Sequence, residues 1–279
     1  MPGYDLHTHS TFSDGFTSVE SNVEVAARLG LEGIGVTDHD TTAPFESARA
    51  AGDAAGIEVV LGTEFSAEEE GLSVHVLGYW IDPGYAPLAE ELDRLVDERT
   101  DRARRIVARF NGLGIPITFE RVRELAGTAP IGRPHLADAV VELGAAASRG
   151  EVFDRYLADG GPAYVPKHAV SPERAVELLV AAGGVAVLAH PGLFGDRTGS
   201  DGLPGAVIER MHAVGLAGIE ADHPDHTEAH RRHYRDVALG LGLEVTAGSD
   251  HHGQGEEDRL GRATTERAVV ERLRGWRLA

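Results

Sequence analysis

The sequence predicts an α/β fold in which a parallel barrel or sheet carries a helical insertion. Three observations support this fold class. The chain has 279 residues, a normal length for one α/β barrel. Short apolar, β-branched runs recur, and most alternate with helical patterns, which is typical of parallel strands joined by crossover helices. One stretch, residues 88–165, breaks this rhythm because helical patterns follow one another there.

The predicted strands are short and end in polar or histidine-rich sequence. They cover residues 4–7, 33–37, 57–63, 73–80, 185–189, 217–221 and 243–247. Residues 19–29 form a predicted helix. The run Ser171-Pro172-Glu173 predicts the start of another helix, because it combines an N-cap residue, a first-turn proline and an early acid. The helical period places Val176, Leu179 and Val180 on one face of that helix.

The stretch from 88 to 165 predicts a helical insertion. Apolar residues from Leu88 to Phe110 fit one long amphipathic helix, and shorter helical patterns follow at 118–126, 134–146 and 150–158. We therefore predict a barrel domain formed by residues 1–87 and 166–279, with an insertion domain formed by residues 88–165.

Composition excludes several classes of function. The chain has no cysteine, which leaves histidine and carboxylate as the strong metal ligands. The formal net charge of −19 repels polyanions, so we expect no long duplex nucleic acid as a partner. No run approaches the roughly 18 apolar residues that span a bilayer, and the polar first residues indicate no signal peptide. We expect a cytoplasmic protein with no membrane partner.

Residues that can bind metal occur at or near the ends of six of the seven predicted strands. The first strand carries His7 and His9, with Asp14 following. Alternate residues of a strand face one side, so these two histidines can point at the same ion. On its own, such an H-x-H pair fits partly exposed histidines of an edge strand equally well.

The later motifs strengthen the metal hypothesis because they occur together. Burying so many polar groups at one end of a barrel is costly unless something compensates their charge, and metal ions would do so. The motifs are Asp38-His39, Glu64, His75 within its strand, His190 and Asp250-x-His252.

The order of these motifs resembles that of the PHP (polymerase and histidinol phosphatase) family. The matching motifs are His7-x-His9, Asp14, Asp38-His39, Glu64, His75, His190-Pro191 and Asp250-x-His252. The resemblance covers most of the chain and implies a distorted, seven-stranded (β/α) TIM-like barrel. It implies two or three divalent ions, and nitrogen and oxygen ligands suit Mn, Fe or Zn. The implied metal ligands are His7, His9, Asp14, His39, Glu64, His75, His190, Asp250 and His252. Glu64 would bridge two ions and, with His190 and Asp250, forms the implied catalytic centre; His190 is a ligand or a proton donor.

Two further motifs resemble those of stand-alone family members that act on nucleotide phosphates. They are Gly132-Arg133-Pro134-His135-Leu136 and Tyr164-Val165-Pro166-Lys167-His168. Those members include 3′,5′-nucleoside bisphosphate phosphatases and an exonuclease that trims short RNA from its 5′ end. The resemblance implies hydrolysis of a 3′,5′-nucleoside bisphosphate to a nucleoside 5′-monophosphate, or of the 5′ end of short single-stranded RNA, by a metal-activated hydroxide that attacks phosphorus.

Four residues are candidates for substrate binding. Arg133, His135 and Lys167, the only lysine of the chain, would hold the phosphate, while His223 follows a strand and would line the site. For Arg133 and His135, an ordinary role at a helix start fits equally well.

Other functions remain as alternatives. Histidinol phosphate would present its phosphate to the same metals. An amidohydrolase would also carry an H-x-H motif and a final aspartate, but it commonly uses a bridging lysine in a context that Lys167 lacks. A metal-binding module without activity is the alternative that is not an enzyme.

Overall fold

The computed structural model describes residues 3–127, 131–158, 160–166, 169–193, 202–253 and 259–277. Its internal contacts divide the chain into two compact units. Unit 1 consists of Met1–Leu92 and Val170–Ala279, and unit 2 consists of Asp93–Ala169. We describe each unit by itself.

Unit 1 is built on a seven-stranded sheet whose strands follow the order of the sequence, from β1 to β7. The strands are β1 (Tyr4–Asp5), β2 (Gly33–Val36), β3 (Glu58–Glu69), β4 (Leu72–Tyr79), β5 (Val185–Leu188), β6 (Leu216–Asp222) and β7 (Glu244–Ala247). Each of the seven predicted strands is therefore present, although β3 extends further than predicted.

One strand runs against the predicted parallel arrangement. β4 pairs antiparallel with both β3 and β5, whereas the other neighbours pair in parallel. Glu70 and Gly71, which join β3 to β4, have φ angles of 48° and 88°. Two residues with positive φ form the tight turn of a β-hairpin, and strands joined by such a turn must be antiparallel.

The sheet closes into a nearly complete barrel beyond β1 and β7. Thr8 and His251 form an isolated parallel bridge, and the His9 N–H donates to the carbonyl of His251 over 2.8 Å. These contacts bring the first and last strand ends together, as expected for the distorted barrel that the sequence predicted.

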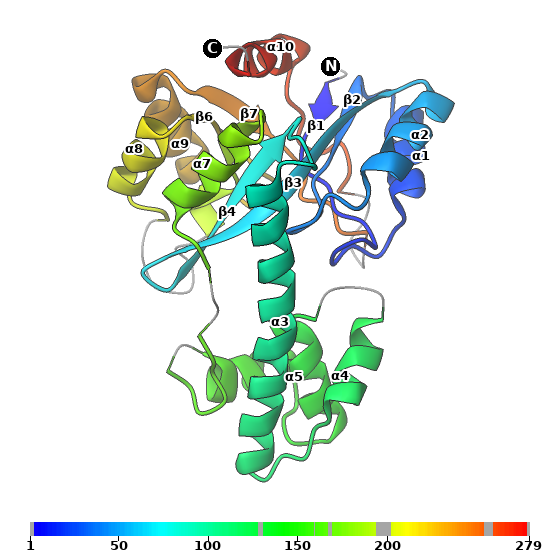
Figure 1. Cartoon of the computed structure of the whole chain (residues 1–279), viewed down its shortest axis with the longest axis vertical. Helices are drawn as coiled ribbons and strands as arrows, with labels where there is room; N and C mark the ends of the chain where they lie inside the picture. Colours follow the sequence, from blue (N-terminus) through cyan, green and yellow to red (C-terminus); the bar gives the residue numbers. More distant parts are fainter. Residues whose placement is uncertain are drawn as a thin grey trace. The chain divides into compact units, whose positions relative to one another are not determined.

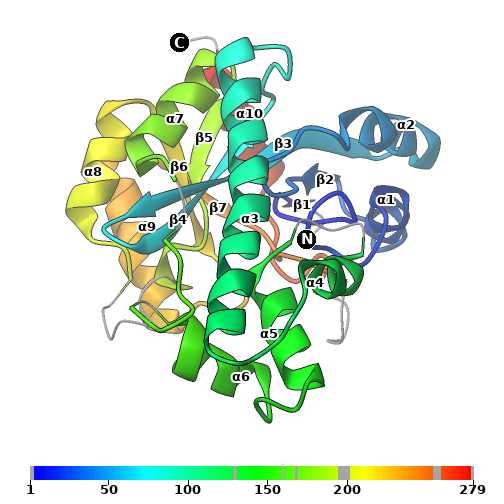
Figure 2. The same ribbon diagram turned by 60° about the horizontal axis from the view of Figure 1, so that its bottom comes forward.

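Helices cover the outside of this sheet (Figures 1 and 2). They are α1 (Val19–Arg28), α2 (Phe45–Ala55), α7 (Pro172–Ala181), α8 (Gly205–Ala213), α9 (Glu228–Leu241) and α10 (Arg267–Trp276), with a short 3₁₀ turn, η2, at Pro191–Leu193. The helix α7 begins as predicted, because the Ser171 side chain accepts from the Arg174 N–H. Its buried face differs from the prediction: Val176 and Leu179 are buried, but Val180 is exposed.

The barrel core is sealed at the end where the parallel strands begin. Its buried cluster includes Tyr4, Val60 and Val187, and Val270 and Leu273 of α10 join it. Side chains of α10 also pair with Glu58 and Glu244, the first residues of β3 and β7. Since α10 occupies this end, the polar ends of the strands face the opposite end (Figure 1).

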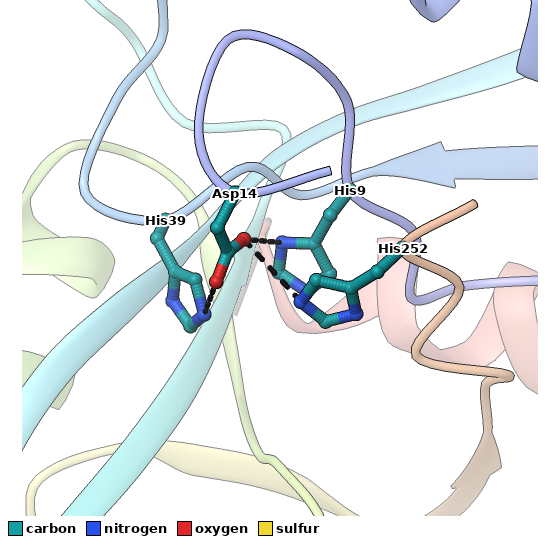
Figure 3. Close-up of side chains that lie close together, drawn as sticks. All are labelled: His9, Asp14, His39 and His252. Carbon is teal, nitrogen blue, oxygen red and sulfur yellow. Dashed lines mark ion pairs between the residues drawn. The ribbon is translucent and has the colours of Figure 1, made fainter. Parts of the chain in front are cut away.

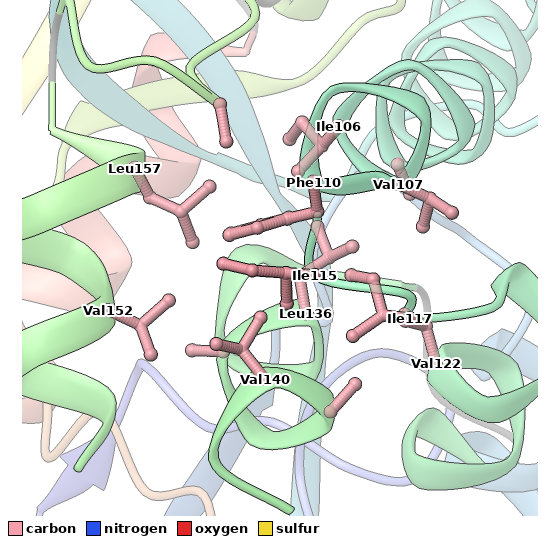
Figure 4. Packing of buried hydrophobic residues seen from close by; sticks show 14 of the residues in the cluster. Ile106, Val107, Phe110, Ile115, Ile117, Val122, Leu136, Val140, Val152 and Leu157 are labelled. Atoms are coloured by element: carbon pink, nitrogen blue, oxygen red, sulfur yellow. The ribbon is translucent and has the colours of Figure 1, made fainter. Parts of the chain in front are cut away.

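Unit 2 is helical and has an apolar core of its own (Figure 4). The long helix α3 (Ala86–Gly112) begins in unit 1, and α4 (Phe119–Ala126), α5 (Arg133–Glu142), α6 (Arg149–Val152) and the π-helical turn η1 (Phe153–Leu157) follow. Phe110, Leu136 and Leu157 are fully buried in this core. Among the helices within the described ranges, none combines the length and apolar character needed to cross a membrane.

Candidate metal centre

The structure brings all nine predicted metal ligands together in unit 1. His7 and His9 follow β1, His39 follows β2, His190 follows β5, and Asp250 and His252 follow β7, while Glu64 and His75 lie within β3 and β4. Asp14 lies on the loop after His9. Because the carboxyl ends of neighbouring parallel strands meet at one end of a barrel, residues far apart in the sequence become neighbours there.

Glu64 lies at the centre of the cluster. Its Oε2 is 3.2 Å from Nε2 of both His7 and His9, and 3.1 Å from Nδ1 of His39. Its Oε1 is 2.7 Å from Nδ1 of His75 and 3.0 Å from Nε2 of His190. The side chain is 1% exposed. One buried carboxylate therefore faces five imidazoles.

Three overlapping sets of these side chains have ligand atoms close enough to hold an ion. The inner group consists of His7, His9, Glu64 and Asp250. The outer group consists of His9, Asp14, His39 and His252, whose side chains point toward one another in Figure 3. The middle group consists of His39, Glu64 and His75.

The spacing within the inner group fits a metal ion. Nε2 of His7 and Nε2 of His9 lie 3.1 Å apart, and both face Glu64 Oε2. Two nitrogen ligands about 2.1 Å from one ion lie roughly 3 to 3.4 Å apart. Glu64 Oε2 is buried and has no hydrogen-bond partner. A cation between these atoms would be bound by both imidazole lone pairs and by the carboxylate oxygen at once.

Neighbouring groups orient the imidazoles. Nδ1 of His7 is 3.1 Å from both carboxylate oxygens of Glu220, and Nδ1 of His252 is 2.9 Å from the carbonyl oxygen of Asp250. In each case Nδ1 carries the proton that is donated, which leaves the Nε2 lone pair for a metal. Nε2 of His252 lies 3.3 Å from Asp14 Oδ1.

Asp38 shapes the loop that carries Asp14. Its carboxylate accepts hydrogen bonds from the Ser10 N–H (2.9 Å), the Ser10 hydroxyl (2.8 Å) and the Ser13 hydroxyl (2.7 Å). Gly15 permits the close return of this loop, since a Cβ there would lie 2.7 Å from backbone atoms of His9. Asp38 therefore holds the loop, and Asp14 faces His9 and His39.

Backbone strain is concentrated at the cluster. Asp40, His190 and Asp250 have φ angles of 52°, 23° and 51°, in the region that glycine favours. Such conformations cost on the order of 1–3 kcal/mol each and persist where the surroundings impose them. The Asp40 carboxylate is held by the Ser66 N–H at 2.7 Å.

Electrostatics keep the carboxylates of the cluster ionised. Burial would raise the pKa of Glu64, but the facing imidazoles of His39, His75 and His7 hold it well below its usual range. Burial also opposes protonation of His9, yet its contacts with Asp250 and Glu64 raise its pKa to about 10. Burial lowers the pKa of His39 to about 4. Some imidazoles thus hold protons that a metal ion would replace.

The four predicted substrate-binding residues lie in different parts of the chain. Arg133 and His135 lie at the start of α5 in unit 2, where the Gly132 N–H donates to His135 Nδ1 over 3.0 Å and the Arg133 guanidinium lies 5.7 Å from the centre of the Phe153 ring. Their roles at the phosphate stay predictions. Lys167 lies outside the described residues.

His223 lies beside the inner group. It is fully buried, and its Nε2 is 3.6 Å from Asp250 Oδ2. The Asp225 N–H donates to its Nδ1 over 3.2 Å, so the neutral ring carries its proton on Nε2. By contrast, both ring nitrogens of His226 bond to the backbone, to Ala221 O (2.8 Å) and to the Gly192 N–H (3.0 Å), which indicates a structural role.

Glu220, a fully buried residue of β6, also accepts a hydrogen bond from the His190 N–H over 3.0 Å but is not among the predicted site residues. A signal was present: a single glutamate in the apolar run Leu216–Asp222 must be compensated when that strand is buried. It belongs to no motif that we recognised.

The family profile described as "PHP domain" matches residues 5–113. Among solved structures, a putative metal-dependent phosphoesterase from Bifidobacterium adolescentis superposes with a TM-score of 0.86 at 33% sequence identity. That comparison covers 99% of this chain and 96% of the other.

Three curated relatives are similar in sequence. The phosphoribosyl 1,2-cyclic phosphate 1,2-diphosphodiesterase of Eggerthella lenta is 35% identical, over 90% of this chain and 94% of its own. The 3′,5′-nucleoside bisphosphate phosphatase of Chromobacterium violaceum is 34% identical, over 93% and 90%. The 5′-3′ exoribonuclease Rnm of Salmonella typhimurium is 36% identical, over 68% and 66%.

Proposed function

Because the chain belongs to the PHP family and is a metal-dependent phosphoesterase, we propose that it removes the 3′-phosphate from a 3′,5′-nucleoside bisphosphate. The observation that carries the proposal is the clustering of the nine predicted ligands, with Glu64 at the centre. Metal ions held by these residues would bind and polarise the phosphate of a phosphomonoester.

The supply of lone pairs supports three ions. A neutral imidazole offers one lone pair, so His9 and His39 can each serve one ion although each belongs to two groups. With His9 in the inner group and His39 in the outer group, His75 and His190 remain beside Glu64 Oε1 and complete the middle site. If three ions bind in this way, Glu64 would be the residue that serves two of them.

When bound, the ions supply an activated water and neutralise the oxygens of the phosphate. The protein residues supply geometry and a donor. Glu64 and Asp250 stay ionised and bring negative charge that holds the cations in place. His223, with its Nε2–H buried beside Asp250, provides a hydrogen-bond donor for a phosphate oxygen.

The nucleotide assignment is supported by the relatives. Two of the three named relatives act on nucleotides or RNA by their names, and one of them, the bisphosphate phosphatase, matches along 93% of this chain. The net charge of −19 agrees with a small or short substrate.

We further propose that unit 2 recognises the substrate. Arg133 offers a planar guanidinium that can bind a phosphate through two hydrogen bonds, and His135 and Lys167 would add donors. This role corresponds to the insertion domain predicted for residues 88–165 and accounts for the motif at the start of α5.

The test is phosphate release by protein loaded with Mn²⁺, compared among adenosine 3′,5′-bisphosphate, histidinol phosphate and AMP. His9→Ala should abolish release. His233→Ala is the matched control, because His233 is exposed on α9. Release from the bisphosphate that is lost only in His9→Ala is the expected result.

Other outcomes would redirect the proposal. Release only from histidinol phosphate would retain the chemistry and reject the nucleotide. A second candidate is hydrolysis of a phosphodiester, favoured by the names of the cyclic phosphate diesterase and the exoribonuclease. It would be indicated by cleavage of a cyclic ribose phosphate or of 5′-phosphorylated short RNA instead. Bound metal without turnover of any of these substrates would indicate an inactive metal-binding module.

A further inference from the structure

The carboxylate of Glu220 touches two parts of the metal centre without belonging to any of the three ligand groups. Its two oxygens each lie 3.1 Å from His7 Nδ1, and Oε2 also accepts the His190 N–H over 3.0 Å. Glu220 lies on β6, whereas His7 follows β1 and His190 follows β5. One side chain thus links two strand ends to a third strand.

We propose that Glu220 is a positioning residue for the ion of the inner group, because it holds His7 with Nε2 toward the cluster and holds the backbone of His190. This inference rests on the proposed ligand set. An imidazole that donates from Nδ1 to a carboxylate keeps its Nε2 lone pair and becomes a more basic ligand. His7 Nε2 lies 3.2 Å from Glu64 Oε2 and 3.5 Å from Asp250 Oδ1, where that lone pair is needed.

The second hydrogen bond of Glu220 acts on a strained residue. His190 has a φ of 23° and precedes a proline, which further restricts its backbone. Its side chain reaches Glu64 Oε1 at 3.0 Å. By anchoring the His190 N–H, Glu220 favours the backbone conformation from which this contact is made.

The backbone at Gly248 packs closely against the contact between Glu220 and His7. A Cβ on Gly248, which follows β7, would lie 2.3 Å from His7 Cβ and 2.4 Å from Glu220 Oε1. The glycine therefore lets the last strand close over this hydrogen bond, and the buried carboxylate and the His7 ring are pressed together. Glu220 and His7 are both fully buried, so water cannot replace either partner.

Glu220→Gln tests the proposal with nearly unchanged shape. The amide has only one oxygen, and its NH₂ group would either face the His7 Nδ1–H or donate to Nδ1 and move the ring proton to Nε2. Both alternatives weaken His7 as a ligand. Partners of this kind are worth roughly 10- to 100-fold in metal affinity. We expect the dissociation constant of the tightest Mn²⁺ site to rise by about that factor.

The measurement is a calorimetric titration of the metal-free protein with Mn²⁺, together with activity as a function of Mn²⁺ concentration. For Glu220→Gln, the Mn²⁺ concentration that gives half-maximal activity should rise, while activity at saturating Mn²⁺ recovers. A general loss of structure would not show this recovery. Glu58→Gln is the matched control, because Glu58 is a sheet carboxylate at the opposite end that bonds to Tyr4 and Arg274.

His7→Gln separates the possible failures. If His7→Gln loses the tight site and Glu220→Gln titrates as the wild type does, the role of Glu220 is overturned and the proposed ligands stand. If both variants titrate as the wild type does, the inner ligand set itself is wrong.

A measurement on the wild-type protein tests the proposal even if the Glu220→Gln variant does not fold. In protein with ¹⁵N-labelled histidine and bound Zn²⁺, NMR should show the His7 proton on Nδ1, the signal being assigned by its loss in His7→Gln. A proton on Nε2 would overturn the proposal.

Discussion

The inner and outer ligand groups use the same kinds of side chain in different surroundings. In the inner group, His7 and His9 are 0% exposed, Glu64 is 1% exposed and Asp250 is 18% exposed. In the outer group, Asp14 is 42% exposed and His252 is 33% exposed. Inner residues follow or lie in strands, and Glu220 supports one of them, whereas Asp14 lies on a loop.

If both groups bind an ion as proposed, this difference in exposure predicts one permanent ion and one exchangeable ion. Buried ligands that are already held in place lose little conformational freedom when they bind an ion. Solvent-exposed ligands must lose their hydration and the mobility of their loop. Both groups share His9. We therefore expect the inner ion to remain through purification and the outer ion to follow the metal concentration of the solution.

Glu64→Gln should have the largest effect, because it removes the charge that the inner and middle groups share. Activity should fall by more than the roughly 100-fold expected for losing a residue that only supports a ligand. Metal analysis after gel filtration should show the loss of tightly bound ions. Glu68→Gln, on the same strand, is the control. Retention of both metal and activity would remove Glu64 from the centre.

Asp250→Asn should act mainly on the inner group, the one ligand group to which Asp250 belongs. It leaves His7 and His9 in place but removes a carboxylate 3.1 Å from His9 Nε2. We expect kcat/KM to fall by about 100-fold or more, and excess Mn²⁺ should not restore it. Kinetics at several Mn²⁺ concentrations provide the measurement, and full rescue by metal would place Asp250 with the exchangeable ligands.

Asp14→Asn should produce a smaller defect that metal can correct. Two of the four residues of the outer group, Asp14 and His252, are partly exposed. Loss of Asp14 should therefore raise the Mn²⁺ requirement by about tenfold while maximal activity is nearly kept. The same kinetic series compares it directly with Asp250→Asn. A defect in Asp14→Asn that excess Mn²⁺ leaves unchanged would contradict the distinction between the two groups.

Stepwise chelation of the wild-type protein should distinguish the ion of the outer group from the ion of the inner group, and it should have the smallest effect of these experiments. A weak chelator should remove the outer ion first and lower the melting temperature only slightly. Removal of the inner ion should lower the free energy of unfolding by more. The loss should be about 2.7 kcal/mol if the free metal concentration was 100 times the dissociation constant of the inner ion. Calorimetry with parallel metal analysis measures both steps. Loss of all ions in a single step would show that the groups bind as one unit.

Sequence patterns predicted where the strands lie and which residues cluster around Glu64, but not the direction of every strand or the residues that support the cluster. Apolar, β-branched runs mark where strands occur, but their periodicity carries no direction, so the antiparallel course of β4 followed only from the turn at Glu70 and Gly71. Ligands stood in motifs of recognisable order. Glu220 did not, because a supporting carboxylate is defined by the ring it touches, and that contact joins residues 213 positions apart.

The predicted face of α7 illustrates another limit. Helical periodicity places Val180 near Val176 and Leu179, but the position of the sheet decides which part of the face is covered, and Leu178 is buried instead. Similarly, the pattern Gly132-Arg133-Pro134-His135 fits a helix start and a phosphate site equally well. The structure shows the helix start, while the proposed phosphate contact awaits the substrate.

The separate core of unit 2 has an evolutionary consequence. Within its described residues every buried side chain is apolar, whereas the buried polar groups that the structure describes belong to unit 1. Substitutions in the apolar core of unit 2 therefore replace no predicted metal ligand, because all nine lie in unit 1. An insertion of this kind can therefore change in sequence while the predicted metal ligands of the barrel stay the same.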